Sequence, residues 1–288
     1  MIFDTIKIKA KAVYGIIMDA CKHFSNDNIA LAIGSISFFT FLSLVPLTLI
    51  AVKLAAPYFP KFLDTAQITL GPTLYTSINI QLEAVKQVTE LPLIFALIFG
   101  LWSGGNIFLN LEAAMNVVFQ APKQRPLWRR RVLAVFMIFI FAVFFILAFL
   151  SANFVNILST MNIKVFAEMV EIMTTLQKFT ITIAIPTVLI IALYAAIYFR
   201  LPNVKMPFRY VFPGAISAGI AWTISLHIFS WFAGFNFSRY QIIYGSLTSI
   251  TLLLMWLYYS SYVLMFGAEL SAAAYRYKLS KKKEIEEK

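Results

Sequence analysis

The chain has 288 residues, of which 60% are hydrophobic and only 13% are charged, and its mean hydropathy is +0.80. This composition lies far outside that of soluble globular domains and predicts an integral membrane protein. The formal net charge of +11 could indicate a nucleic-acid partner, but the placement of the charges along the chain favours an explanation from membrane topology instead.

The first segment, residues 1–28, is predicted to form a cytoplasmic amphipathic helix on the membrane interface. Its apolar residues, from Phe3 to Phe24, roughly follow helical spacing, and its four lysines could meet anionic headgroups. Lysines interrupt the segment too often for the continuous apolar core of a cleaved signal peptide.

Six apolar runs follow, each long enough, at about 20 residues, to cross a bilayer. The predicted transmembrane helices are residues 29–55, 91–119, 132–152, 180–200, 211–233 and 245–275, and the basic tail is 276–288. The connections 56–90 and 153–179 are long and amphipathic, which predicts short helices that act either as a lid or as packing over the bundle. We therefore expect an all-α, polytopic membrane protein with a single domain over residues 1–288.

Basic residues are distributed unevenly over the predicted loops. Eighteen of the 24 lysines and arginines lie before the first run, in Lys123–Arg131, in Arg200–Arg209 or from Arg276 onward, and six lie elsewhere. The excess of positive charge in cytoplasmic loops predicts that these segments and both termini are cytoplasmic. No nucleic-acid partner is needed to explain the net charge.

The sequence contains few candidates for disulfide bonds, metal ligands or catalytic groups. The single cysteine, Cys21, cannot form an intramolecular disulfide, and His23 and His227 are too scattered for a zinc site. There is no glycine-rich phosphate loop and no nucleophile beside a plausible base. We therefore expect no metal, no cofactor and no enzymatic activity.

Two carboxylates fall inside predicted helices, where a charge at mid-membrane costs roughly 2.5–3.5 kcal/mol. Glu112 and Glu269 each lie about 20 residues into a helix that runs toward the cytoplasm, near the inner end of a core roughly 30 Å thick. One interpretation pairs each acid with a basic neighbour, among Arg129–Arg131 or Arg276. The other makes them a substrate-facing or proton-linked pair across a cavity, and the sequence leaves both open.

The second predicted helix carries further polar residues on two faces. A serine and two asparagines share one face, while Glu112 and Asn116 lie one turn apart on another. Two adjacent glycines would permit close helix contact, local unwinding or a hinge, and hydrogen bonding between helices is the alternative explanation for the polar residues. The candidate substrate-binding or transport residues are Ser103, Gly104, Gly105, Asn106, Asn110, Glu112, Asn116 and Glu269.

Five stretches carry a family pattern: SFFTFLSLVPL (37–47), LWSGGNIFLNLEAAMN (101–116), RLPNVK (200–205), FPGA (212–215) and IYGSLTSITLLLMWLYYSSYVLMFGAEL (243–270). Together they resemble the YihY / virulence factor BrkB family of bacterial inner-membrane proteins. The last block is the most specific, with Gly267, Ala268, Glu269 and Leu270 in the family's positions. The chain departs from the family at 38–39, where two phenylalanines stand in place of a common tyrosine.

The resemblance implies a six-helix protein of the bacterial inner membrane, with proposed family roles in exporting or translocating lipids or other amphiphiles and in supporting the cell envelope. The family has also carried the label ribonuclease BN, which no residue pattern here supports. We therefore expect a transporter or translocase with a lipid-like or amphipathic substrate and membrane lipids as partners. The alternative is a non-transporting scaffold for envelope-biogenesis partners, and the sequence does not indicate an oligomeric state.

Overall fold

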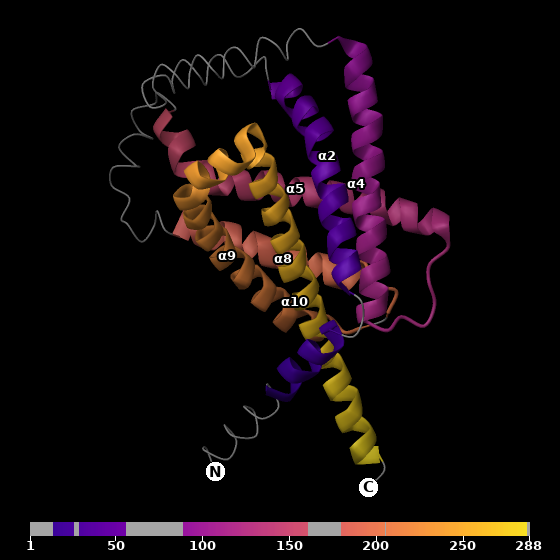
Figure 1. The fold of residues 1–288 in the computed structure, drawn as a ribbon. Coiled ribbons are helices and arrows are strands. Elements are labelled where there is room, and N and C mark those ends of the chain that lie inside the picture. The colour runs from indigo at the N-terminus through magenta and orange to yellow at the C-terminus, as the bar shows by residue number, and fades with distance from the viewer. Residues whose placement is uncertain (1–13, 26–28, 56–88, 161–179, 205, 287–288) are drawn as a thin grey trace.

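The computed structural model describes residues 14–25, 29–55, 89–160, 180–204 and 206–286 of the chain. Over these residues it contains helices, turns and short loops, and no strand (Figure 1). This confirms the predicted all-α class. The short helices expected in the outer connections fall mainly at 56–88 and 161–179, outside the described residues.

A helix lies at each of the six apolar runs, and several extend beyond the predicted ends. In chain order the elements are a helix Tyr14–Ser25, α2 (Ile29–Ala55), α4 (Glu90–Val118), α5 (Leu127–Thr160), the π-helical turn η1 (Thr180–Ala184), α8 (Ile185–Arg200), α9 (Phe208–Tyr244), the 3-10 turn η2 (Gly245–Leu247) and α10 (Thr248–Glu286). α5 and α9 extend beyond both ends of their predicted ranges, and α10 extends beyond the C-terminal end of its range.

Length and apolar composition decide which of these helices can cross a membrane. Three described helices meet both requirements, over Glu90–Val118, Phe208–Asn236 and Thr248–Ser280. The helix Tyr14–Ser25 together with Ile29–Leu44 would make a fourth span, although the chain bends by 74° between them. α8 is apolar but has only 16 residues, about 24 Å at roughly 1.5 Å per residue. The described residues thus support three spans, or up to four, and the six predicted spans are not confirmed.

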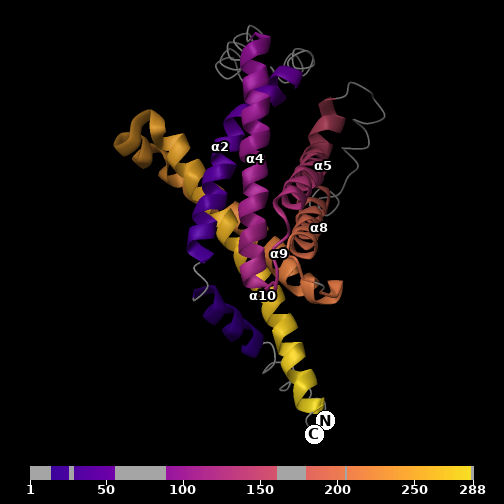
Figure 2. The same ribbon diagram turned by 90° about the vertical axis from the view of Figure 1, so that its right-hand side faces the viewer.

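The helices pack as two pairs that are joined at one end. α2 runs along α4, and α9 runs along α10, while α10 also contacts α2 and α5 lies against α8 and α4 (Figures 1 and 2). Ser37 on α2 donates a hydrogen bond to Ser261 on α10 at 3.1 Å, and the hydroxyl of Tyr198 on α8 donates to the Leu264 carbonyl at 2.6 Å. α10 therefore contacts helices of both pairs, and α5 makes a second connection by lying against α4 and α8.

Two glycines set the closest approach of α9 and α10. A Cβ atom on Gly214 would collide with the side chain of Ser271 and the carbonyl of Gly267, and one on Gly267 would collide with Ala218 and the Tyr198 hydroxyl. Small residues allow this contact between helix backbones. The fully buried Met265 and Ala268 pack at the same level, so the densest part of the bundle surrounds the segment that contains Glu269.

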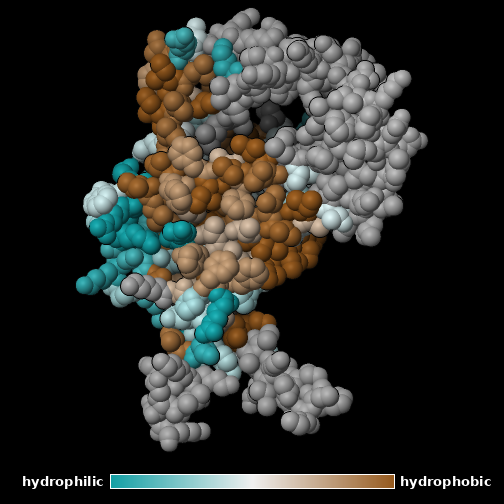
Figure 3. All heavy atoms as spheres, turned by 180° about the vertical axis from the view of Figure 1, so that it is seen from behind, coloured by the Kyte–Doolittle hydropathy of each residue, from teal (hydrophilic) through white to brown (hydrophobic). Residues whose placement is uncertain are grey.

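The described surface is largely apolar across the middle of the molecule, with hydrophilic residues gathered toward one side and below (Figure 3). Exposed aliphatic and aromatic side chains occur on α4, α5, α9 and α10, for example Phe95, Phe139, Trp231 and Tyr259. A soluble monomer rarely exposes so much contiguous apolar surface. The exposed face therefore suits contact with lipid rather than water.

Candidate functional site

Glu112 is buried on α4, with 1% of its side chain exposed, and makes two ion pairs. Nη1 of Arg125 lies 3.0 Å from Oε1, and Nε of Arg130 lies 3.2 Å from Oε2. Arg125 belongs to the basic loop after α4 and Arg130 to the first turn of α5. Each carboxylate oxygen thus has its own guanidinium donor, which offsets the cost of removing the charge from water.

Arg125 also fastens the end of α8 to this carboxylate. Its guanidinium donates to the carbonyl oxygens of Arg200 at 3.3 Å, Leu201 at 2.5 Å and Pro202 at 3.1 Å. These carbonyls stand at a helix C-terminus, where the last carbonyls have no partner within the helix and attract positive charge. One side chain therefore joins α4 to the loop that follows α8.

A second link between the same segments comes from Asn116, one turn after Glu112. The backbone N–H of Asn203 donates to Oδ1 of Asn116 at 2.8 Å, and the amide side chain of Asn203 donates to the Lys123 carbonyl at 2.8 Å. We name Glu112, Asn116, Arg125, Arg130 and Asn203 the α4 cluster. It holds both predicted basic loops against the end of α4.

Glu269 is completely buried on α10 and pairs with Arg276, two turns further along the same helix. Nη2 of Arg276 lies 2.5 Å from Oε1 of Glu269 and 2.9 Å from Oδ2 of Asp19. The same guanidinium donates from Nη1 to the Val118 carbonyl at the end of α4, at 3.3 Å. We name Asp19, Glu269 and Arg276 the α10 cluster, which joins the N-terminal helix, α4 and α10.

The contacts of both glutamates match the interpretation that pairs each acid with a basic neighbour. Arg130 and Arg276 were among the expected partners, whereas Arg125, Asp19 and Asn203 were not predicted. Different arginines hold the two carboxylates, and neither glutamate lines either of the two pockets described below. The predicted role of Glu112, Asn116 and Glu269 in transport stays a prediction.

The remaining polar residues of α4 bond within their own helix rather than across to another. The side chains of Ser103, Asn106 and Asn110 donate to the carbonyls of Phe99, Trp102 and Asn106 at 2.8, 2.9 and 2.8 Å. Such bonds satisfy the polar group locally. The described contacts therefore show hydrogen bonds along α4, where the sequence suggested bonds between helices.

The helix also runs without a break through Gly104 and Gly105. A Cβ atom on Gly105 would meet nothing within 4 Å, and one on Gly104 would lie 3.8 Å from Ile138, an ordinary contact. The suggested unwinding or close helix contact at these glycines is not observed. Close approach requires glycine at Gly214 and Gly267 instead, because α9 and α10 meet there.

An apolar groove of about 500 Å³ runs between α5, α8 and the start of α9. None of its residues was predicted as a site, although small residues at one-turn spacing on α8 leave the space that forms it. Among the described residues that line it, Arg200 is the only charged one. The lining residues are Phe136, Ile140 and Phe144 of α5, Val188, Ile191, Ala192, Ala195, Ala196, Phe199 and Arg200 of α8, and Phe208 and Phe212 of α9.

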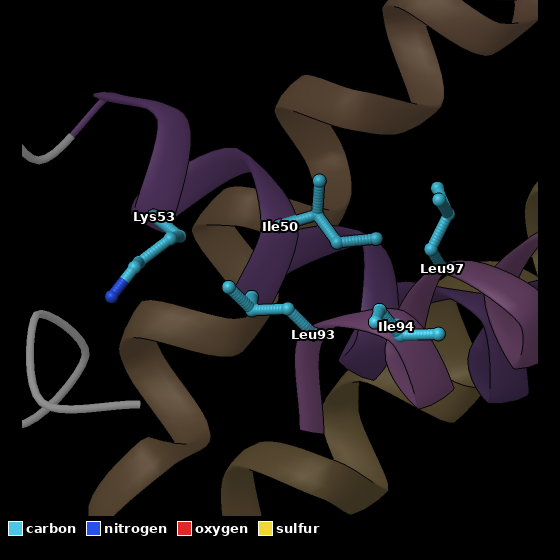
Figure 4. A pocket seen from close by; sticks show the side chains of 5 residues that line it. All are labelled: Ile50, Lys53, Leu93, Ile94 and Leu97. Atoms are coloured by element: carbon cyan, nitrogen blue, oxygen red, sulfur yellow. The ribbon is translucent and has the colours of Figure 1, made fainter. Parts of the chain in front are cut away.

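A smaller pocket of about 220 Å³ lies between the end of α2 and the start of α4. Four apolar side chains line it with Lys53, whose amine points away from them (Figure 4). All five lining residues lie in the last two turns of α2 or the first two turns of α4.

Comparison with known proteins identifies the family. The sequence profile of the virulence factor BrkB family matches residues 20–288, and the chain belongs to this family. A UPF0761 membrane protein of Alteromonas mediterranea is 22% identical over 94% of this chain and 90% of its own length. A UPF0761 membrane protein of Paraburkholderia xenovorans is 26% identical over 94% of this chain, but the chain spans only 61% of that protein.

A further relative, of Bacillus subtilis, carries the name putative ribonuclease-like protein YfkH. It is 25% identical over 85% of this chain and 90% of its own length. No solved structure matches the chain. The family and the membrane character of the chain are thereby shown, while the names of these relatives assign no substrate.

Proposed function

We propose that this BrkB-family chain is a multi-pass protein of the bacterial inner membrane that translocates a lipid-like or amphipathic substrate, with its termini in the cytoplasm. The observation that carries the proposal is the apolar groove of about 500 Å³ with one arginine on its lining. Its volume falls in the range of about 300–1,000 Å³ for ligand pockets. An apolar wall with one charged group suits a molecule with a hydrocarbon part and a charged part.

The placement of the exposed basic side chains supports the proposed orientation. Arg129 and Arg131 at the start of α5, Arg200 at the end of α8 and Arg209 at the start of α9 are all exposed. All four belong to the two short basic loops and the helix ends beside them, which the α4 cluster joins. A positive surface at this end fits the cytoplasmic side of a bacterial inner membrane.

The two glutamate clusters have a positioning role in this proposal. Arg125 holds the end of α8, and Arg200 is the last residue of that helix. Glu112 therefore supports one end of the groove from outside it. A direct contact of Glu112 or Glu269 with substrate remains the sequence-based alternative.

Reconstitution of the purified chain into liposomes tests the proposal. The rate at which a fluorescent phospholipid crosses the bilayer is measured from the loss of fluorescence when a reductant that cannot cross the membrane is added outside. The reductant reacts only with labelled lipid in the outer leaflet. We expect Ala196→Trp, which fills the groove, to slow the movement roughly tenfold, a change of about 1.4 kcal/mol. Ala142→Trp on α5 is the matched control, because Ala142 is exposed and does not line the groove.

Two outcomes would count against the proposal in different ways. If the wild-type chain moves no lipid faster than empty liposomes, translocation is wrong. If Ala196→Trp is as active as Ala142→Trp, the groove is not the route. In the same assay, full activity of both Glu112→Gln and Glu269→Gln would exclude a substrate-contacting role for these acids.

The second candidate function is a non-transporting scaffold for envelope-biogenesis partners. The observation that favours it is that both buried glutamates form ion pairs with arginines. These pairs hold the basic loops in place and leave neither carboxylate without a counterion. If the chain is a scaffold, liposomes that contain the wild-type protein should show no lipid movement above that of empty liposomes. Partner proteins should then copurify with the chain. We propose that the chain is not an enzyme. Cleavage of RNA by the rigorously purified protein would overturn this proposal.

A further inference from the structure

We propose that the groove between α5, α8 and α9 binds one anionic phospholipid, with an acyl chain along the apolar wall and the phosphate at Arg200. This inference deepens the proposed function and rests on the same groove. It adds a substrate class, a headgroup charge and the residue that selects it.

The side chain of Arg200 is available for a phosphate. It is exposed, and the described residues contain no carboxylate that pairs with it. The centroid of the neighbouring Phe199 ring lies 6.0 Å from its Cζ. By contrast, Arg125, Arg130 and Arg276 are all paired with buried acids. Arg200 is therefore a cation without a described counterion, beside an apolar groove.

The backbone of Arg200 is held in place while its guanidinium is left accessible. Arg125 donates to the carbonyl of Arg200 at 3.3 Å and to the carbonyls of the next two residues. The α4 cluster thus fixes the backbone position from which the Arg200 side chain extends beside the groove. An arginine fork presents two parallel donors to a phosphate, which a lysine at this position would not do.

The rest of the groove fits a hydrocarbon chain and not a second polar group. The wall beyond Arg200 consists of aromatic and aliphatic side chains, with Ala192 and Ala196 leaving room on α8. Phe208, in the first turn of α9, lines the same groove. This turn carries no acidic residue that would compete with a phosphate for the guanidinium of Arg200. The charged end and the apolar length therefore match a lipid with a negative headgroup.

Native mass spectrometry of the delipidated full-length chain tests this inference independently of transport. The protein is mixed with equal amounts of phosphatidylglycerol and phosphatidylcholine of identical acyl chains, and the ratio of bound lipids is measured. We expect the wild type to prefer phosphatidylglycerol. Arg200→Gln should lower this preference at least about fivefold, as the loss of a charge-assisted contact predicts.

Two variants make the measurement specific. Arg131→Gln removes the same charge from an exposed arginine that does not line the groove, and it should keep the preference. Ala196→Trp should lower binding of both lipids, because it takes the space of the acyl chain. Inorganic phosphate at millimolar concentration should not displace the lipid, since it cannot fill the apolar wall.

The outcomes separate this inference from the proposed function. Equal lipid preference in the wild type and Arg200→Gln overturns the site, as does displacement by phosphate alone or unchanged binding in Ala196→Trp. Selective binding without lipid movement in liposomes supports the site and overturns translocation. Lipid movement without an effect of Arg200→Gln on binding supports translocation and overturns the site. Variants are compared only where their gel-filtration profile and helical circular dichroism match the wild type.

Discussion

Glu112 and Glu269 look alike in the sequence but are held in different ways. Glu112 is held by two arginines from segments that follow its helix, and both are at least three-quarters shielded from solvent. Glu269 is held by Arg276 on its own helix, and that arginine is shared with Asp19, which is 37% exposed. The comparison shows that burial of an acid does not by itself tell how many arginines hold it, or whether they come from its own helix or from other segments.

The largest effect is expected from Glu112→Gln. The amide nitrogen of the new glutamine would place a hydrogen-bond donor against a guanidinium, which is also a donor. Arg125 and Arg130 would both lose the negative charge with which they pair. Removing one partner of a buried ion pair costs roughly 3–5 kcal/mol. The melting temperature of the purified chain in detergent should fall more than for any other variant described here.

Glu90→Gln is the matched control for that measurement. Glu90 is on the same helix but is exposed, so its replacement should leave the melting temperature nearly unchanged. A Glu112→Gln chain as stable as Glu90→Gln would show that the two ion pairs contribute little to folding.

A smaller effect is expected from Glu269→Gln. Arg276 would lose its buried partner but keep Asp19 and the Val118 carbonyl. We expect a loss of roughly 2–3 kcal/mol, below the full cost of breaking a buried pair because a counterion remains. If this variant is destabilised more than Glu112→Gln in the same detergent, the proposed ranking of the two clusters is wrong.

The smallest effect is expected from Asp19→Asn. Water screens this partly exposed carboxylate, so that its replacement should cost less than about 1 kcal/mol. The loss should shrink further when salt is raised, because ions screen an exposed pair. Melting curves at low and high salt measure both effects, and a large, salt-independent loss would mean that Asp19 is the main counterion of Arg276.

Local features of the sequence were enough to predict helix positions. An apolar run of about 20 residues has few alternatives to a helix in a membrane, and α2 and α4 begin within one residue of the predicted ranges. The two acids also stood out, because charges are rare in such runs. Arg276 was an expected partner because it is the basic residue nearest to Glu269 in the chain, and Arg130 was one because it belongs to the basic segment that follows the helix of Glu112.

Only the tertiary structure decided which distant segments meet. Asp19 and Arg276 are 257 residues apart, and Arg125 reaches a carbonyl 76 residues further on. The groove likewise needs α5, α8 and α9 together, and no single helix shows it. The sequence by itself determined the helical class, the membrane character and the buried acids, because these depend on local composition. The partners of those acids and the shape of the groove depend on how helices pack, which local composition does not specify.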